Sequence, residues 1–264
     1  MTLSVVTWNV NSVRLRLPGA RRLVRRFAPD VLCLQETKAT DEVFPRQAFA
    51  TMGYEHALLR GMKGYNGVAI LSRQPFEVAQ AQPWGGGGDC RHAAVHLAGG
   101  IELHNVYVPA GGDIPDPKSN PKFAHKLRFL DDMTRWFARH RSGRDAMILV
   151  GDLNVAPLEA DVWSHRQLLT VVSHTPVEVE RLARLGAAVE WTDAVRHFIT
   201  PEQKLYSWWS YRNRDWAASD RGRRLDHVWV TPALVGRLKS AQILREMRGW
   251  VRPSDHVPVI VTLD

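Results

Sequence analysis

The chain has 264 residues, 45% of them hydrophobic and 23% charged, a balance typical of a folded globular protein that argues against an intrinsically disordered chain. Its net charge of +8 and its pI of about 9.9 favour a polyanionic partner, either nucleic acid or an acidic membrane surface, although a generally Arg-rich composition would give the same values. Because the sequence has two cysteines, Cys33 and Cys90, and no signal peptide or transmembrane stretch, we expect a protein of the reducing cytoplasm.

Short runs of apolar and β-branched residues, bounded by Gly, Pro, Asn or Asp, predict strands along the chain. In chain order they are 3–11, 30–36, 67–72, 93–97, 101–109, 146–154, 225–231 and 257–263. Amphipathic segments between them predict helices at 18–28, 122–140 and 176–188. Because some strands follow one another directly and others are separated by helices, we expect packed sheets flanked by helices, in a single domain spanning 1–264.

Polar side chains recur at the ends of these predicted strands. They are Asn9, Asn11, Glu36, Tyr107, Asp152, Asn154, Asp226, Asp255 and His256. Most have an ordinary alternative explanation as a turn former, a cap or a solvated strand end, and Tyr107 as a half-buried strand tyrosine. For Asp226 the alternative is a buried pair, because a charge inside an apolar strand is costly unless it is paired. The recurrence favours a shared polar site over turn chemistry alone.

The residue types in this set suit the hydrolysis of a phosphodiester. A carboxylate such as Glu36 is the kind of ligand that Mg²⁺ takes, together with water and substrate phosphate. Asp152, Asn154, His256 and Tyr107 could orient the attacking water, accept its proton and stabilise the charge on phosphorus. The sequence lacks the spacings of a zinc site, a nucleotide-binding P-loop and an α/β-hydrolase nucleophile.

Eight segments of the sequence, taken in order, resemble the exonuclease III family of AP endonucleases, part of the wider endonuclease/exonuclease/phosphatase superfamily. They are WNVNSVR (8–14), LQETK (34–38), NGVAILSR (66–73), NVYVP (105–109), GDLNVAP (151–157), SWWSYR (207–212), RRLDHVWVT (223–231) and SDHVPV (254–259). The resemblance implies a four-layered α/β sandwich, with two mixed β-sheets packed face to face, helices on the outside and catalytic groups at one edge.

The resemblance also implies a role for each polar residue. The implied metal ligands are Glu36 as the principal one, then Asn9, Asp255, Asp152 and Asn154. Asp152 would activate the water or protonate the leaving oxygen, and Asn154 would orient the nucleophile. His256 and Tyr107 would contact the scissile phosphate, and Asp226 would hold the imidazole of His256. The implied cation is Mg²⁺, for which Mn²⁺ would substitute.

Basic and aromatic residues beside these motifs resemble the family's DNA-binding surface. Trp208 and Leu225 correspond to the lining of its pocket for an abasic sugar. We also expect DNA contacts from Arg212, Arg223, Lys122 and Lys126, although each arginine has the alternative of a solvated position over core tryptophans. The sequence departs from the family at Ala110, where a polar residue is common, and at Arg223, where an apolar or aromatic residue is common.

The resulting prediction is a Mg²⁺-dependent DNA-repair nuclease that cuts 5′ to abasic sites and leaves a 3′-hydroxyl. It would also have 3′→5′ exonuclease and 3′-phosphatase or phosphodiesterase activity. Its partner would be double-stranded DNA with abasic sites or 3′ ends, without a membrane, and the protein would be a monomer. Two alternatives are a hydrolase of lipid or inositol phosphates and a catalytically silent DNA-binding module.

Overall fold

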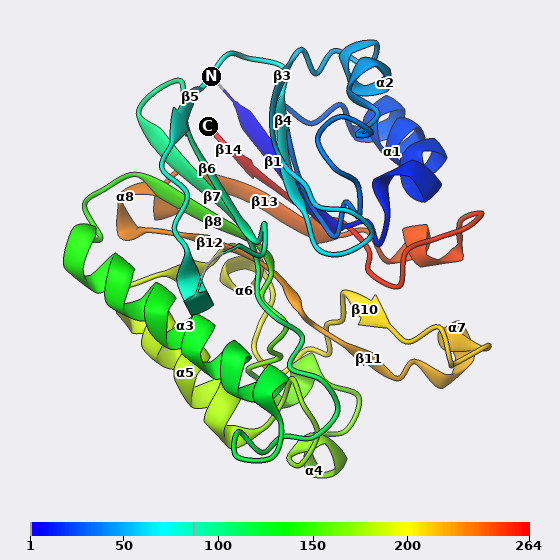
Figure 1. Ribbon diagram of the computed structural model, residues 1–264, viewed down its shortest axis with the longest axis vertical. Coiled ribbons are helices and arrows are strands. Elements are labelled where there is room, and N and C mark those ends of the chain that lie inside the picture. Colours follow the sequence, from blue (N-terminus) through cyan, green and yellow to red (C-terminus); the bar gives the residue numbers. More distant parts are fainter. Residues whose placement is uncertain (1, 87) are drawn as a thin grey trace.

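Two mixed six-stranded sheets form the centre of the molecule (Figure 1). The computed structural model describes residues 2–86 and 88–264. The first sheet has the strand order β13 (Leu238–Ile243), β14 (Val259–Leu263), β1 (Leu3–Asn9), β2 (Val31–Gln35), β4 (Val68–Ser72) and β3 (His56–Arg60). The second has the order β5 (Glu77–Ala79), β6 (His92–Leu97), β7 (Ile101–Tyr107), β8 (Met147–Asp152), β12 (Asp226–Val230) and β9 (Thr192–Asp193). Each sheet is mixed, since the central pairs β1–β2 and β7–β8 are parallel and their other neighbours antiparallel.

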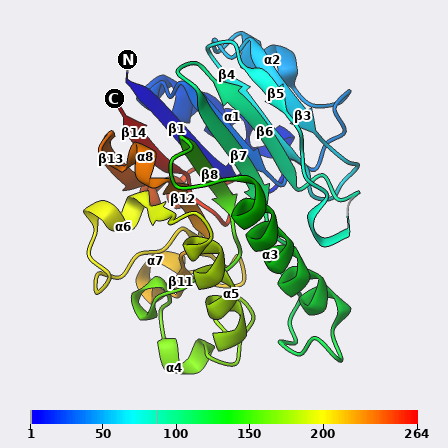
Figure 2. The ribbon, with the colours of Figure 1, turned by 90° about the vertical axis from the view of Figure 1, so that its left-hand side faces the viewer.

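Helices cover the outer face of each sheet, which completes the four predicted layers (Figures 1 and 2). The helices α1 (Val13–Phe27) and α2 (Arg46–Ala50) lie on the first sheet, and α3 (Pro121–His140) and α5 (Pro176–Ala187) lie on the second. The shorter elements are α4 (His165–Leu168), α6 (Ala194–Phe198), α7 (Trp216–Ser219), α8 (Pro232–Val235), the hairpin β10 (Trp208–Trp209) and β11 (Gly222–Arg223), and the 3₁₀ turns η1 (Trp84–Gly86), η2 (Glu159–Asp161) and η3 (Arg245–Gly249).

Alternation along the strands divides the core into an inner layer and two outer layers. In β1, Val5 belongs to the cluster between the sheets, whereas Val6 packs in the cluster under α1. In β2, Cys33 faces the other sheet and Leu32 faces the helices. Such strands are apolar on both faces because both faces are covered, which explains their continuous hydrophobic runs.

The predicted long helices at 122–140 and 176–188 are confirmed as α3 and α5. Each begins with a proline in its first turn, after a polar cap residue. Asn120 accepts a hydrogen bond from the amide of Lys122, and Thr175 forms a capping box with Glu178.

The helix predicted at 18–28 begins earlier, at Val13, so that start was wrong. Pro18 lies inside α1, where the pattern suggested a helix start. A turn through Asn11 and Ser12, both with positive φ, brings the chain from β1 into the helix. In this turn the side chain of Asn11 contacts Asp255 and Lys38.

Several strands lacked a clear sequence signal. The edge strands β3 and β13 are largely exposed or half-buried, so they do not show a strong apolar run. The hairpin β10–β11 has two residues in each strand, which is too short for any periodicity. In the part of the chain that the structure describes, no helix has both the length and the apolar character needed to span a membrane.

Candidate active site

The ends of three neighbouring strands in the second sheet bring three of the predicted residues together. In the pairing of β7 with β8, Tyr107 lies opposite Asp152. In the pairing of β12 with β8, Asp226 lies opposite the same aspartate. Strand register therefore sets a phenol and two carboxylates side by side, although 45 residues or more separate them along the chain.

The first sheet supplies Asn9, the last residue of β1, and Glu36, which directly follows β2. The Asn9 side-chain nitrogen donates at 2.9 Å to Glu36 Oε1 and at 2.9 Å to Asp152 Oδ2. Its side-chain oxygen accepts from the backbone amide of Asn11 at 3.0 Å. One buried amide thus ties a carboxylate from each sheet across the interface between them.

This orientation gives Asn9 a structural role. Its side-chain oxygen accepts from the Asn11 amide, and its nitrogen faces the carboxylates of Glu36 and Asp152. Asn9 therefore holds the two acids in place. The role of Asn9 as a metal ligand stays a prediction.

Two further side chains contact Glu36, and its backbone conformation is unusual. The Tyr107 hydroxyl donates to its Oε1 atom at 2.8 Å, and the Lys38 ammonium lies 2.8 Å from its Oε2 atom. Burial would raise the pKa of Glu36, but the hydrogen bonds from Asn9 and Lys38 and the charge of Lys38 lower it overall. The residue is in the left-handed region, with φ of 50°. Glu36 is therefore held ionised at the floor of the site.

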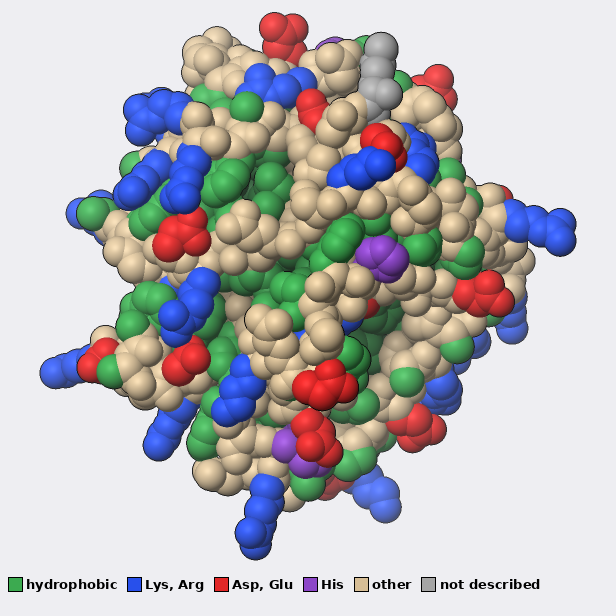
Figure 3. All heavy atoms as spheres, turned by 180° about the vertical axis from the view of Figure 1, so that it is seen from behind, with side chains coloured by type: hydrophobic (Ala, Val, Ile, Leu, Met, Phe, Trp, Pro, Cys, Tyr) green, Lys and Arg blue, Asp and Glu red, His purple; other side chains and the backbone are tan. Residues whose placement is uncertain are grey.

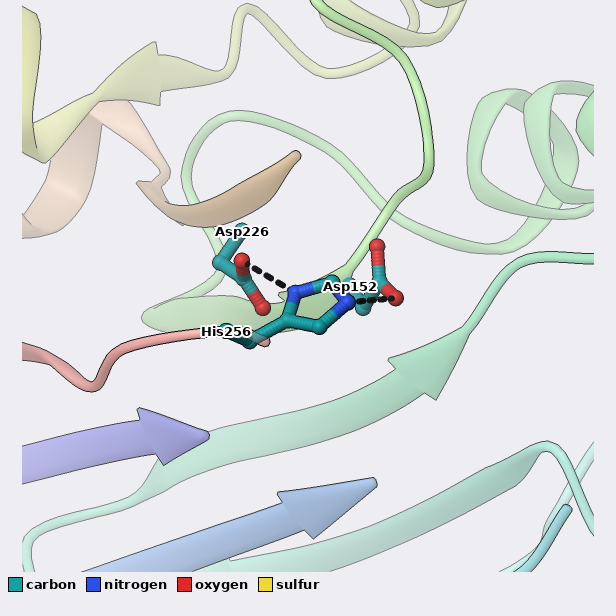
Figure 4. A group of neighbouring side chains, drawn as sticks. All are labelled: Asp152, Asp226 and His256. Atoms are coloured by element: carbon teal, nitrogen blue, oxygen red, sulfur yellow. Dashed lines mark hydrogen bonds and ion pairs between the residues drawn. The ribbon is translucent and has the colours of Figure 1, made fainter. Parts of the chain in front are cut away.

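His256 lies between two carboxylates (Figure 4). Its Nδ1 atom is 2.8 Å from Asp226 Oδ2, and its Nε2 atom is 3.6 Å from Asp152 Oδ2. Burial would lower the pKa of His256, but Asp226, Asp152 and Asp255 raise it to about 10. Burial raises the pKa of Asp152 to about 7, against the opposing charge of the imidazolium. The site thus holds a cation beside an acid that can exchange a proton near neutral pH.

The trio Asp152, Asp226 and His256 has ligand atoms within 4.8 Å of one another, a spacing that a metal site could also have. A metal needs a neutral imidazole with a free lone pair. Here both ring nitrogens of His256 already face carboxylate oxygens. Hydrogen bonding therefore explains this trio better than metal ligation does.

Asn154 follows Asp152 in a tight turn. Its φ is 53°, and its backbone amide donates to Asp152 Oδ1 at 3.0 Å. The side-chain nitrogen donates to the Val108 carbonyl at 2.9 Å. The sequence left open whether Asp152 and Asn154 form an Asx-type turn or belong to a functional site. The structure is compatible with both, because the turn places Asn154 in the lining of the site.

Asp255 also lines the site, directly before His256 in the chain. It accepts from the side chain of Asn11 at 3.0 Å and from the indole nitrogen of Trp208 at 3.0 Å. Burial would raise its pKa, but His256 and these two donors lower it. The carboxylate is therefore charged and fixed in direction.

A cavity of about 810 Å³ opens from these groups toward the hairpin β10–β11. The predicted residues in its lining are Glu36, Tyr107, Asp152, Asn154, Asp255, His256, Trp208, Leu225, Arg212 and Arg223. Leu225 belongs to an apolar cluster against which Trp208 packs. Lys122 is exposed and lies beside Gly112 at the cavity wall. The structure therefore gathers the polar centre and the expected substrate-binding residues, apart from Lys126, around one space.

Lys126 is the residue whose expected role was wrong. Its side chain is fully buried and forms an ion pair with Glu178, which is also fully buried. The ammonium donates to the carbonyls of Asn154 at 2.7 Å and Ala110 at 3.3 Å. A group enclosed in this way has no surface to offer to DNA, and it instead supports the backbone of the Asn154 turn.

Three supporting residues were missed as site residues. Lys38 contacts Glu36, and Ser207 donates to Asp226 Oδ2 at 2.6 Å. The Arg91 guanidinium lies 4.7 Å from the centre of the Tyr107 ring. The segments LQETK and SWWSYR contain Lys38 and Ser207, so a signal was available for these two; nothing in the sequence around Arg91 indicated its role.

Comparison with known proteins gives a match over almost the whole chain. The profile of the Endonuclease/Exonuclease/phosphatase family matches residues 6–256. Among curated proteins, the chain is similar to the exodeoxyribonuclease III of Haemophilus influenzae, with 25% identity over 271 residues that cover 97% of this chain and 98% of the relative.

Solved structures agree with this match. An AP endonuclease from Archaeoglobus fulgidus is 31% identical, with a TM-score of 0.92 and coverage of 99% of both chains. A 3′ phosphatase from Neisseria bound to a product DNA hairpin is 32% identical, with a TM-score of 0.90 and the same coverage. The predicted sandwich of two sheets is confirmed by these neighbours and by the observed strand order.

Proposed function

The chain belongs to the Endonuclease/Exonuclease/phosphatase family and is a phosphodiester hydrolase, and from this premise we propose that it is a Mg²⁺-dependent DNA-repair nuclease. It cuts the backbone 5′ to abasic sites, leaves a 3′-hydroxyl, and removes nucleotides or phosphate groups from 3′ ends. The observation that carries the proposal is the convergence of Glu36, Asp152 and His256 on one cavity with the Trp208–Leu225 wall.

The residues present fit a hard divalent cation. Carboxylate oxygens of Glu36 and Asp152 converge on the same amide of Asn9, and Asp255 adds a third charged carboxylate to the cavity. These are the oxygen ligands that Mg²⁺ prefers, and Mn²⁺ would substitute because it accepts the same donors. When bound, the cation would neutralise negative charge on the phosphate during hydrolysis.

Side chains of the protein then bind the phosphate, orient the attacking water and transfer a proton. His256, cationic through its contact with Asp226, binds a phosphate oxygen, and the Tyr107 hydroxyl donates from the adjacent strand end. Asn154 orients the attacking water. Asp152, with a pKa of about 7, either takes the proton of that water or gives one to the departing 3′ oxygen. Both roles suit a carboxyl group that titrates near neutral pH.

The apolar wall supports an extruded abasic sugar as the group held beside the phosphate. Trp208 and Leu225 line the cavity next to Asp255 and His256, and an extruded nucleotide needs such a pocket. Arg212 lines the cavity, and Lys122 lies beside Gly112 in its wall; both are exposed and suit contacts to backbone phosphates.

The basic balance of the chain suits a polyanionic partner, and the similarity to nucleases and to a 3′ phosphatase bound to a DNA hairpin supports double-stranded DNA as that partner. Figure 3 shows Lys and Arg side chains projecting around much of the outline of one face, with acidic side chains between them. We infer that the protein acts as a monomer in the cytoplasm.

Cleavage of defined duplexes tests the proposal. A labelled duplex with one abasic analogue and an intact duplex with a recessed 3′ end are incubated with the protein in Mg²⁺ or in EDTA. We expect incision at the lesion in Mg²⁺ alone. Glu36→Gln and His256→Asn should each lower the rate at least about 100-fold. The matched control is Glu77→Gln, since Glu77 is exposed on the edge strand β5.

Other outcomes would redirect the assignment. Near-normal cleavage by Glu36→Gln would remove the proposed metal role. Turnover of inositol phosphates without cleavage of either duplex would favour the lipid or inositol phosphate hydrolase. Tight binding of abasic DNA without cleavage, by protein shown to be folded, would favour the silent binding module.

A further inference from the structure

Arg223 projects into the recess that Trp208 and Leu225 line. It lies on β11, directly opposite Trp208 on β10. Side chains of directly opposed residues lie on the same face of a hairpin. The guanidinium carbon of Arg223 is accordingly 5.3 Å from the centre of the Trp208 ring, and both residues line the cavity.

The guanidinium spans from this ring to the loop on the far side of the recess. Its Nη1 atom donates to the carbonyl of Val172 at 2.9 Å and to the hydroxyl of Ser173 at 2.8 Å. Its Nε atom is buried and has no hydrogen-bond partner among the residues that the structure describes. Arg223 is thus fixed at one end and keeps an unused donor.

The neighbouring arginine shows what a structural arginine looks like in this fold. Arg224 is buried and donates to Asp161 at 2.7 and 2.9 Å and to Asp193 at 2.6 Å. Arg223 donates to neutral oxygens instead. Burial lowers the pKa of Arg223, and the acid that opposes this is Glu178, whose carboxylate is already paired with Lys126.

The electrostatic consequence is a positive charge in a partly enclosed space, with no carboxylate of its own among the residues that the structure describes. Such a cation gains most when an anion enters, because charge-assisted hydrogen bonds are stronger than neutral ones and strengthen further away from water. The rest of this wall is apolar, with Trp208 and Leu225 joined by Trp163 and Val171. The recess therefore suits a small organic group that ends in a negative charge.

We propose that Arg223 is a specificity-determining residue that selects phosphate substituents carrying their own negative charge, such as a short hydroxy acid esterified to a 3′-phosphate, over neutral substituents of the same size. The inference rests on the proposed function. In the reaction, water adds to phosphorus, the bond from phosphorus to the DNA 3′ oxygen breaks, and that oxygen takes a proton. The phosphate leaves with its substituent still attached.

Two matched 3′ ends test the selection. One duplex ends in a 3′-phosphodiester of glycolate, and the other in a 3′-phosphodiester of ethylene glycol, which replaces the carboxylate by a neutral hydroxymethyl group. We expect the wild-type protein to prefer the glycolate end by about tenfold in kcat/KM, the effect of one charge-assisted hydrogen bond. Rising salt should reduce this ratio.

Variants at Arg223 assign the preference. Arg223→Leu should bring the ratio to about one while the neutral end is still cleaved, and Arg223→Lys should give an intermediate ratio because it keeps the charge but loses the planar fork. Arg139→Leu, at an exposed position in the last turn of α3, serves as the control and should keep the wild-type ratio.

Two results would overturn the inference. They are a wild-type ratio near one and an unchanged ratio in Arg223→Leu; if both ends then changed equally, Arg223 would be a steric wall only. If Arg223→Leu does not fold, the wild-type ratio and Arg223→Lys still decide. Cleavage of abasic duplex with a ratio near one refutes this inference alone, whereas no cleavage of any duplex refutes the proposed function with it.

Discussion

Replacing Lys126 by methionine should destabilise the protein strongly, because it leaves a buried charge without its partner. Lys126 and Glu178 are both fully buried. Methionine fills a similar volume but removes the ion pair and the hydrogen bonds to the carbonyls of Asn154 and Ala110. The lost contacts therefore reach from the core to the turn that presents Asn154.

The magnitude follows from what remains around Glu178. Removing one partner of a buried ion pair costs about 3 to 5 kcal/mol. The carboxylate keeps hydrogen bonds from the backbone amides of Ser173 and Thr175 and from the Thr175 hydroxyl, so we expect the lower part of that range. Even about 3 kcal/mol is a large share of the 5 to 15 kcal/mol typical of folded domains.

Urea unfolding followed by tryptophan fluorescence measures the effect, since the chain has 10 tryptophans. The double variant Lys126→Met with Glu178→Gln should be less destabilised than the sum of the two single variants by about 1 to 3 kcal/mol. Lys122→Met on the exposed side of the same helix is the matched control and should change stability by less than about 0.5 kcal/mol. A loss below about 1 kcal/mol in Lys126→Met, or strict additivity in the double variant, would refute the reasoning.

Three further predictions concern the catalytic edge. Asp226→Asn should lower the pKa of His256 from about 10 toward its ordinary 6.5, as NMR titration of the imidazole would show. A raised pKa adds stability that is complete below pH 6.5 and lost as pH rises through about 10. The variant should therefore also lose less stability between pH 7 and about 10 than the wild type. Gly151→Ala should prevent stable folding or lower the free energy of unfolding by more than about 3 kcal/mol in urea. The reason is that φ of Gly151 is 142° and a new Cβ would lie 1.8 Å from the Val106 carbonyl oxygen. Wild-type stability would contradict the β7–β8 pairing. Ser207→Ala should cost about 1 to 3 kcal/mol and lower kcat, because Asp226 and two buried amides lose their shared partner; an unchanged kcat would show that Ser207 does not position Asp226.

The polar strand ends could be recognised from the sequence because a polar or charged residue directly beside an apolar run is visible locally. An apolar strand that finishes in Gly-Asp-Leu-Asn, or a charge such as Asp226 within LDHVWV, is visible without knowing the fold. The long helices were readable for the same reason, since α3 and α5 carry both an amphipathic period and start signals such as the Thr175–Glu178 capping box. The short elements lacked enough residues to show any period.

The tertiary structure decided which groups meet and which side of each group faces the site. The pairing of three strands puts Tyr107 and Asp226 on either side of Asp152. The packing of two sheets directs the nitrogen of Asn9 at both acids.

Lys126 and Arg223 show why the sequence alone could not predict which charged side chains are buried and which face the cavity. Both were expected to contact DNA, yet one is enclosed by Glu178 while the other faces the cavity. Residue type and local period do not distinguish them, because burial and charge pairing depend on segments that lie about 50 residues away along the chain. A sequence specifies which chemistry is available, and the three-dimensional contacts decide which charge is neutralised by a buried partner and which faces the cavity.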